Sequence, residues 1–179
     1  MSIDIKKKMV VLDDLYPNYP RELEGDVVTV YDIAAGFENT PLDLSGIDYE
    51  VEYNRIILEK LRNEKKKQIN VLREIKLNAN MPYTFNGVQD TIQIREKDKI
   101  ILLGLAIKAS KMISQTNEPV IEFRSGNDNK YMLTPTEALT LTTQANSYIE
   151  SVYKESWVYK EQIKNAQTVE ELYAIQWVV

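Results

Sequence analysis

The chain contains no cysteine and no histidine among its 179 residues. The absence of cysteine excludes disulfide bonds, thiolate metal sites, iron–sulfur clusters and a cysteine nucleophile. The absence of histidine removes the commonest metal ligand, the usual general base and every histidine-containing triad. Glycine is also scarce, at six residues, and no glycine-rich phosphate-binding loop occurs. We therefore expect no enzyme, no metal site and no cofactor.

Long apolar runs are missing as well. The longest, Ile100 to Leu105, is interrupted by Gly104, whereas a membrane-spanning helix needs about 18 or more apolar residues. The first residues lack the apolar segment and cleavage site of a signal peptide. We therefore expect no contact with membranes, and synthesis in the cytoplasm followed by retention there or in a particle assembled there.

Positive charge is in deficit, because the formal net charge is −5. Nucleic-acid binding needs concentrated Lys and Arg, so no nucleic-acid partner is expected. The charge is uneven: residues 1–47 hold four basic and nine acidic residues, and residues 60–76 hold seven basic and two acidic ones. The basic stretch, centred on Lys65, Lys66 and Lys67, is typical of a solvated helix face. It is also compatible with a docking site for an acidic partner.

What is present is a mixed pattern of short and long elements. Residues 1–47 carry prolines, glycines and two short apolar runs, Met9–Leu12 and Val27–Tyr31, which predict an extended arm with one or two short strands. The arm is either a flexible N-terminus or a segment that docks on another subunit. In the second case its aromatic residues are the expected anchors: Tyr16, Tyr19, Tyr31 and Phe37.

A long helix is predicted from Asp48 to Asn78, within a segment spanning residues 48–80. Ser45 or Asp48 is the candidate cap. Its apolar stripe is interrupted by seven polar residues between Leu61 and Ile69. A helix that is polar in its middle projects from the body of a protein or bridges parts of an assembly.

Residues 81–179 predict a compact module of two hairpin–helix units. Asn86-Gly87 between short apolar segments is a strong signal for a type I′ hairpin turn. The helix expected over residues 95–115 is apolar on nearly every face, which predicts a central, buried helix. A second hairpin spans residues 120–133, with a turn at residues 125–129 that lacks the spacing of a calcium loop. Capping boxes at Thr134–Glu137 and Thr168–Glu171 open the last two helices.

The predicted fold class is therefore α+β and mainly helical. A long N-terminal helix precedes the two β-hairpin–helix units, and a short C-terminal helix follows them. We expect three parts: an arm over residues 1–47, a long helix over residues 48–80 and the compact module over residues 81–179.

A set of residues in the last two-thirds of the chain forms a further pattern: Lys67-Gln68-Ile69-Asn70, Arg73, Pro82-Tyr83, Asn86-Gly87, Gln89, Ile121-Glu122-Phe123-Arg124, Asp128-Asn129, Leu133-Thr134, Trp157, Lys160, Ala166, Thr168-Val169-Glu170-Glu171-Leu172 and Ile175. Through these residues, residues 60–179 resemble a family of unknown function from tailed bacteriophages, whose members occur among tail and tail-fibre genes. The matching residues include no catalytic signature.

The resemblance implies a structural or attachment component of a phage tail, baseplate or fibre, present in the virion and made in the host cytoplasm. Its partners would be other tail or fibre proteins, and tail parts are symmetric assemblies, so multiple copies are expected. One alternative is a tail-fibre assembly chaperone that is absent from the mature virion. Another is a carboxylate-based glycan hydrolase.

Overall fold

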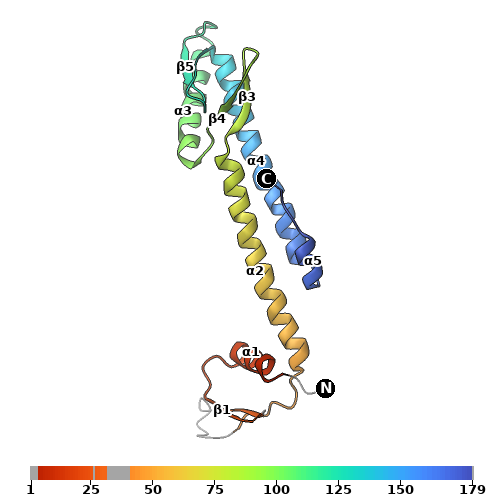
Figure 1. Ribbon diagram of the computed structural model, residues 1–179. Helices are drawn as coiled ribbons and strands as arrows, with labels where there is room; N and C mark the ends of the chain where they lie inside the picture. Colours follow the sequence, from red (N-terminus) through yellow and green to blue (C-terminus); the bar gives the residue numbers. More distant parts are fainter. Residues whose placement is uncertain (1–3, 26, 32–40, 179) are drawn as a thin grey trace. The chain divides into compact units, whose positions relative to one another are not determined.

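The structure, a computed structural model, describes residues 4–25, 27–31 and 41–178 (Figure 1). The chain forms two compact units. The first unit consists of residues 1–64 and 167–172, and the second of residues 65–166 and 173–179.

The described residues form five helices and three two-stranded antiparallel sheets. In chain order they are α1 (Ile5–Leu15), β1 (Arg21–Glu24), β2 (Val27–Val30), α2 (Tyr49–Asn78), β3 (Met81–Phe85), β4 (Val88–Ile92), α3 (Glu96–Met112), β5 (Ile121–Arg124), β6 (Lys130–Leu133), α4 (Pro135–Asn165) and α5 (Val169–Ala174).

The predicted fold class was wrong about how the chain begins. The short helix α1 comes first, and the long helices α2 and α4 follow later in the chain. The run Met9–Leu12, expected as a strand, lies inside α1, whose first turn is capped by the Asp4 carboxylate accepting from the Lys6 amide at 3.0 Å. A run of four apolar residues fits either element, and here the cap and the spacing from Ile5 to Met9 favour the helix.

The first unit joins α1, the β1–β2 hairpin and the first turns of α2. The hairpin pairs Arg21 with Val30, so the strand expected at Val27–Tyr31 is confirmed over Val27–Val30. The helix cap predicted at Asp48 is also confirmed, since its carboxylate accepts from the Val51 amide at 3.1 Å. The apolar core of this unit includes Val11, Leu12, Val30 and Ile56.

The second unit contains the two hairpins in tandem with α3 and α4, as predicted. Both turn residues of the first hairpin have positive φ, 49° at Asn86 and 85° at Gly87, which confirms the type I′ turn. α4 begins at the predicted capping box: the Glu137 amide donates to Thr134 Oγ1 at 3.2 Å, and the Thr134 amide donates to the Glu137 carboxylate at 2.8 Å. α3 lies along the first half of α4 (Figure 1).

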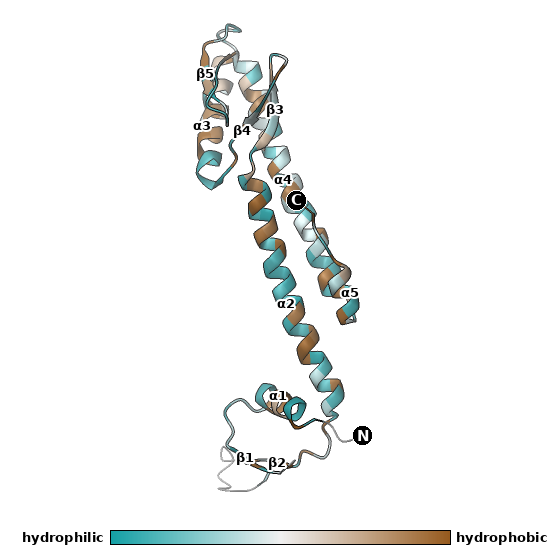
Figure 2. Ribbon diagram, in the orientation of Figure 1, coloured by the Kyte–Doolittle hydropathy of each residue, from teal (hydrophilic) through white to brown (hydrophobic). Residues whose placement is uncertain are grey.

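The prediction that α3 is central and buried was wrong. Only Asp98, Leu102 and Ala109 of this helix are buried, while Ile100 is 75% exposed. α3 packs against α4, and a groove lies between an adjacent side of α3 and β5. A helix buries all its faces only when other elements cover every side. In Figure 2, the middle of α3 is coloured hydrophobic and its first turn hydrophilic.

Candidate interaction surfaces

The two hairpins of the second unit meet at an aromatic stack. Phe85 of β3 is 2% exposed and lies parallel to Tyr131 of β6, with ring centroids 4.0 Å apart. Phe123 of β5 is 5.7 Å from the Phe85 ring on centroids. Aromatic pairs at such distances add to the free energy gained by burying their area. We call this contact between the hairpins the hairpin junction.

The hairpin junction also has a close backbone contact. The Gly126 amide, in the β5–β6 turn, donates to the Thr91 carbonyl of β4 at 2.7 Å. A Cβ atom at residue 126 would lie far inside van der Waals distance of Thr91 Oγ1, and 3.0 Å from Asn80 Nδ2. Only glycine lets the turn approach the strand this closely.

Asp90 is the buried charge of the hairpin junction. Its strand position, opposite Tyr83, puts the carboxylate on the face that meets the second hairpin. One carboxylate oxygen accepts from Asn127 Nδ2 at 2.8 Å and from the Thr91 amide at 2.7 Å. The other accepts from Asn129 Nδ2 and from the Tyr131 hydroxyl, both at 2.9 Å.

The electrostatics of Asp90 follow from this arrangement. Burial alone would raise the pKa of Asp90, but the hydrogen bonds it accepts, that from Asn129 foremost, outweigh burial and hold the pKa below its usual range. Burial, and then the bond to Asp90, raises the pKa of the Tyr131 hydroxyl. Asp90 therefore stays ionised, and both of its carboxylate oxygens accept hydrogen bonds that connect the two hairpins. Because these bonds occupy the oxygens, Asp90 has little capacity to abstract a proton from a substrate.

Sequence reasoning interpreted residues 125–129 as a turn and missed the network that it forms with Asp90. Asn127 and Asn129 direct their amides across the hairpin junction. One signal was available in the sequence: Asp90 occupies the same side of its strand as Ile92, where an apolar residue is the norm. A charged residue at an inward-facing strand position indicates that buried groups pair with it or donate hydrogen bonds to it.

The predicted aromatic anchors of the arm are engaged within the first unit. Tyr16 and Tyr19 are half-buried and pack edge to face, with ring centroids 5.8 Å apart. The Tyr31 hydroxyl donates to the Glu22 carboxylate at 2.9 Å, and this bond raises the pKa of Tyr31. Phe37 lies outside the described residues. The structure brings Tyr16 and Tyr19 together; their role in partner binding stays a prediction.

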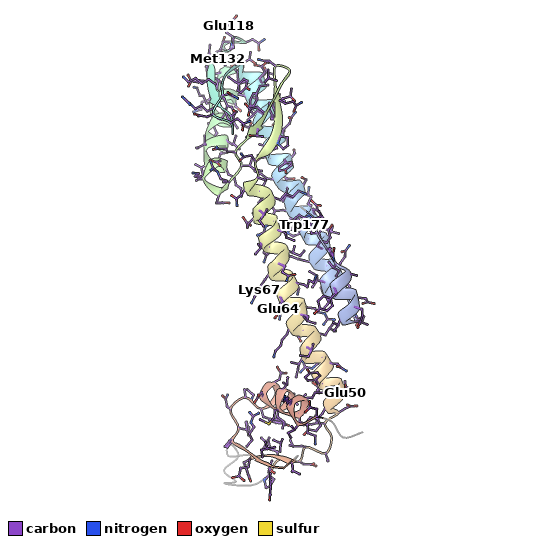
Figure 3. All side chains as sticks on the ribbon, in the orientation of Figure 1. Glu50, Glu64, Lys67, Glu118, Met132 and Trp177 are labelled. Atoms are coloured by element: carbon purple, nitrogen blue, oxygen red, sulfur yellow. The ribbon has the colours of Figure 1, made fainter. Side chains whose placement is uncertain are left out.

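The three lysines of the predicted basic stretch differ in their contacts and in their exposure. Lys65 Nζ donates to the Ile175 carbonyl at 3.2 Å and lies 5.8 Å from the Tyr173 ring centroid, so it holds the C-terminal segment. Lys66 is half-buried, and Lys67 is exposed on α2 (Figure 3). Of the three, Lys67 is the one that a partner could reach most readily.

The C-terminal segment is anchored on α4 by Trp177 (Figure 3). This side chain is 5% exposed. Its indole Nε1 donates to the Glu155 carboxylate at 3.0 Å, and its ring stacks on Tyr159 with centroids 5.4 Å apart. Lys76 of α2 also binds Glu155, at 2.7 Å. These contacts make the segment a structural part of the second unit.

A cluster of cations lies nearby, where α2 and α4 face each other within the second unit. Burial lowers the pKa of Lys160, and the charges of Arg73 and Lys66 lower it further. The Arg73 guanidinium lies over the Tyr153 ring, 4.7 Å from its centroid, and also binds Glu74 at 2.8 Å. Three cations thus lie close enough to interact, and Glu74 already pairs with one of them, Arg73.

Within the described part of the second unit, α3 carries a group of exposed aliphatic side chains. Ile100 is 75% exposed and Ile101 66%, and Leu103 and Ile107 are 61% and 50% exposed. Grooves lie on both flanks of the helix, one lined also by residues of β5 and one by residues of α4. Exposed aliphatic residues in a continuous group on one helix are typical of protein-binding surfaces.

In residues 4–25, 27–31 and 41–178, no group of three or more acidic side chains is placed to hold a metal ion. None of the helices described there combines the length and the apolar character needed to cross a membrane.

Comparison with known proteins gives one match. A family described as "Domain of unknown function (DUF4376)" matches residues 60–176, which is more than half of the chain. The chain belongs to the DUF4376 family. No curated protein and no solved structure matches it.

The DUF4376 region contains the hairpin junction, α3, the cation cluster and Trp157, which is 57% exposed on α4. It excludes α1 and the β1–β2 hairpin. The family description names no activity, so it assigns no role to these residues.

Proposed function

We propose that the protein is a non-catalytic structural or attachment component of a bacteriophage tail that docks on neighbouring subunits. The observation that carries the docking role is the exposed apolar face of α3, since an aliphatic helix face of this size gains free energy only when another surface covers it. The tail setting rests on the resemblance of residues 60–179 to tail-associated phage proteins.

The hairpin junction supports a binding role over a catalytic one. Its one buried carboxylate, Asp90, is committed to Asn127, Asn129 and Tyr131. A general base needs a free lone pair within reach of its substrate. The polar network instead rigidifies the module that carries α3, and a rigid scaffold lowers the entropic cost of docking.

The test is mass spectrometry of purified particles of the phage that encodes the chain, with copy number measured against the capsid protein. Stoichiometric presence is the expected result and would fit a virion tail part. Abundance in the lysate together with absence from particles would contradict this proposal and favour the tail-fibre assembly chaperone.

Matched variants on α3 and α4 test the docking role of α3. Ile100→Gln and Ile107→Gln alter the exposed face of α3, whereas Val158→Gln alters an aliphatic side chain on α4 with a similar exposure of 57%. Incorporation into particles should fall for the α3 variants and stay unchanged for the α4 control. Equal incorporation of all three variants would refute the role of α3.

A further inference from the structure

A stripe of residues runs along the side of α3 that faces away from its core contacts. We call it the outward stripe. At 3.6 residues per turn, positions separated by three, four or seven residues share one side of a helix. On this basis the outward stripe consists of Glu96, Ile100, Leu103, Gly104, Ile107 and Lys111.

The outward stripe is exposed along its length, and at one end the Glu96 carboxylate accepts from Lys99 Nζ of the same helix at 2.6 Å. Glu96 and Lys111 are exposed at its two ends, and Ile100, Leu103 and Ile107 between them are each at least half exposed. A Cβ atom added at Gly104 would meet no atom of the described residues within 4 Å. The buried positions Asp98, Leu102 and Ala109 lie on the opposite side of the helix.

The outward stripe is also symmetric about its centre, the peptide bond between Leu103 and Gly104. Ile100 and Ile107 lie at equal distances on either side of this point in the sequence. Glu96 and Lys111 do so as well, and they carry opposite charges. A pattern that is apolar and self-similar in its middle and oppositely charged at its ends is complementary to its own antiparallel copy.

We infer that the outward stripe is the contact through which two copies of this chain pair, with their α3 helices antiparallel about a two-fold axis at Leu103–Gly104. Such an interface is isologous, so each residue contact occurs twice. Glu96 of each copy then faces Lys111 of the other, and Ile100 faces Ile107 of the other. This inference names the partner of the proposed docking face; it rests on the docking role and is independent of the tail setting.

The centre of the contact explains why a glycine occupies an exposed position in the middle of a helix. Glycine there costs helix stability relative to alanine. At the two-fold axis, Gly104 of each copy would meet Gly104 of the other, and two backbones without side chains can approach closely. Leu103 of each copy would pack on Leu103 of the other on the opposite side of the axis.

The expected affinity is modest because the contact is small. A helix of 17 residues is about 25 Å long, so one helix pair buries less than the roughly 800 Å² per partner of a standard interface. A dissociation constant of about 10 to 100 µM is expected for such a contact. Pairing would therefore be most complete where copies are concentrated, as in an assembly.

Sedimentation equilibrium of the full chain over a range of concentrations tests the pairing. Wild type is expected to shift reversibly from monomer to dimer. Ile100→Gln combined with Ile107→Gln should weaken the dimer by at least about tenfold, and Val158→Gln on α4 should leave it unchanged. A wild type that stays monomeric at about 1 mM would overturn the inference, as would equal dimerisation of the double variant.

Charge reversal tests the partner assignment. Glu96→Lys alone and Lys111→Glu alone should each weaken the dimer, because like charges then meet at both ends of the contact. The double reversal should restore part of the lost affinity. Failure of the double variant to recover any affinity would overturn the pairing of Glu96 with Lys111.

Disulfide trapping tests the antiparallel register, and the chain suits it because it has no native cysteine. Ile100→Cys and Ile107→Cys proteins, each kept separate, should not cross-link efficiently, since identical positions lie about 10 Å apart along the antiparallel helices. An equal mixture should give the heterodimer. Val158→Cys is the control for random collision. Cross-linking of Ile100→Cys with itself in preference to Ile107→Cys would overturn the antiparallel arrangement.

The two proposals fail in different ways. A purified chain that dimerises through α3 but is absent from particles would leave the pairing intact and remove the tail role. A chain found in particles that is monomeric at every concentration would remove the pairing and leave the tail role.

Discussion

The hairpin junction and the outward stripe of α3 belong to the same unit and reverse the usual relation between polarity and burial. The charged side chain of Asp90 is 5% exposed, while the aliphatic side chain of Ile100 is 75% exposed. Asp90 is buried because four donors replace the water it loses. Ile100 is exposed because the described chain places no surface over it. At these two positions, burial follows the available partners and not the hydrophobicity of the side chain.

The largest contrast is expected from truncating one large side chain in each region. Phe85→Ala removes a fully packed ring from the hairpin junction and should lower the free energy of unfolding by about 3–5 kcal/mol. Ile100→Ala removes a side chain that is mostly in water and should change it by less than about 0.5 kcal/mol. Chemical denaturation at a concentration where the chain is monomeric measures both. Equal losses of unfolding free energy in the two variants would contradict the expected difference between the hairpin junction and the outward stripe.

Gly126→Ala places a methyl group against Thr91 inside the hairpin junction. The turn or the strand must shift, and the free energy of unfolding should fall by about 1–3 kcal/mol. A thermal melt measures the loss. Thr91→Ser with Gly126→Ala is the matched control, because it removes the Thr91 methyl group and leaves the hydroxyl that the new Cβ meets. Recovery in that double variant would show that the methyl group, rather than the Oγ1 contact, causes the clash.

Asp90→Asn should change how the stability of the junction depends on pH. Since the folded-state pKa of Asp90 lies below its unfolded value of about 3.9, its stabilisation is complete above that value and is lost as the pH falls toward the folded-state pKa. Wild type should therefore lose more stability than Asp90→Asn between about pH 5 and pH 2. Melting temperatures across this range measure it. Parallel acid losses in the two proteins would show that Asp90 is not the titrating group.

The smallest effect is expected at Gly104, on the outward stripe. A methyl group there would have no atom of the described residues within 4 Å, and alanine favours a helix over glycine by about 1 kcal/mol. Gly104→Ala should therefore stabilise the monomer by roughly that amount, opposite in sign to Gly126→Ala. Denaturant unfolding below the dimerisation range measures this. A destabilised monomer would mean that an atom of the chain already covers Gly104.

Local signals predicted several elements of this fold correctly. Asn86-Gly87 predicted the type I′ turn, because few other residues accept positive φ at both central positions. Thr134 with Glu137, and Thr168 with Glu171, predicted the starts of the last two helices, because each pair satisfies backbone amides within one turn. The helix α1 was missed, since its short apolar run fits a strand as well as a helix.

The sequence by itself determined the turns, the helix caps and the order of hairpin and helix in the second unit, because each depends on residues within a few positions of one another. The tertiary structure alone decided that Asp90 is buried by donors about 40 residues away, and that α3 keeps an apolar face exposed. Both depend on which surfaces meet in space. Periodicity shows that a helix face is apolar, but the packing of distant segments determines whether anything covers it.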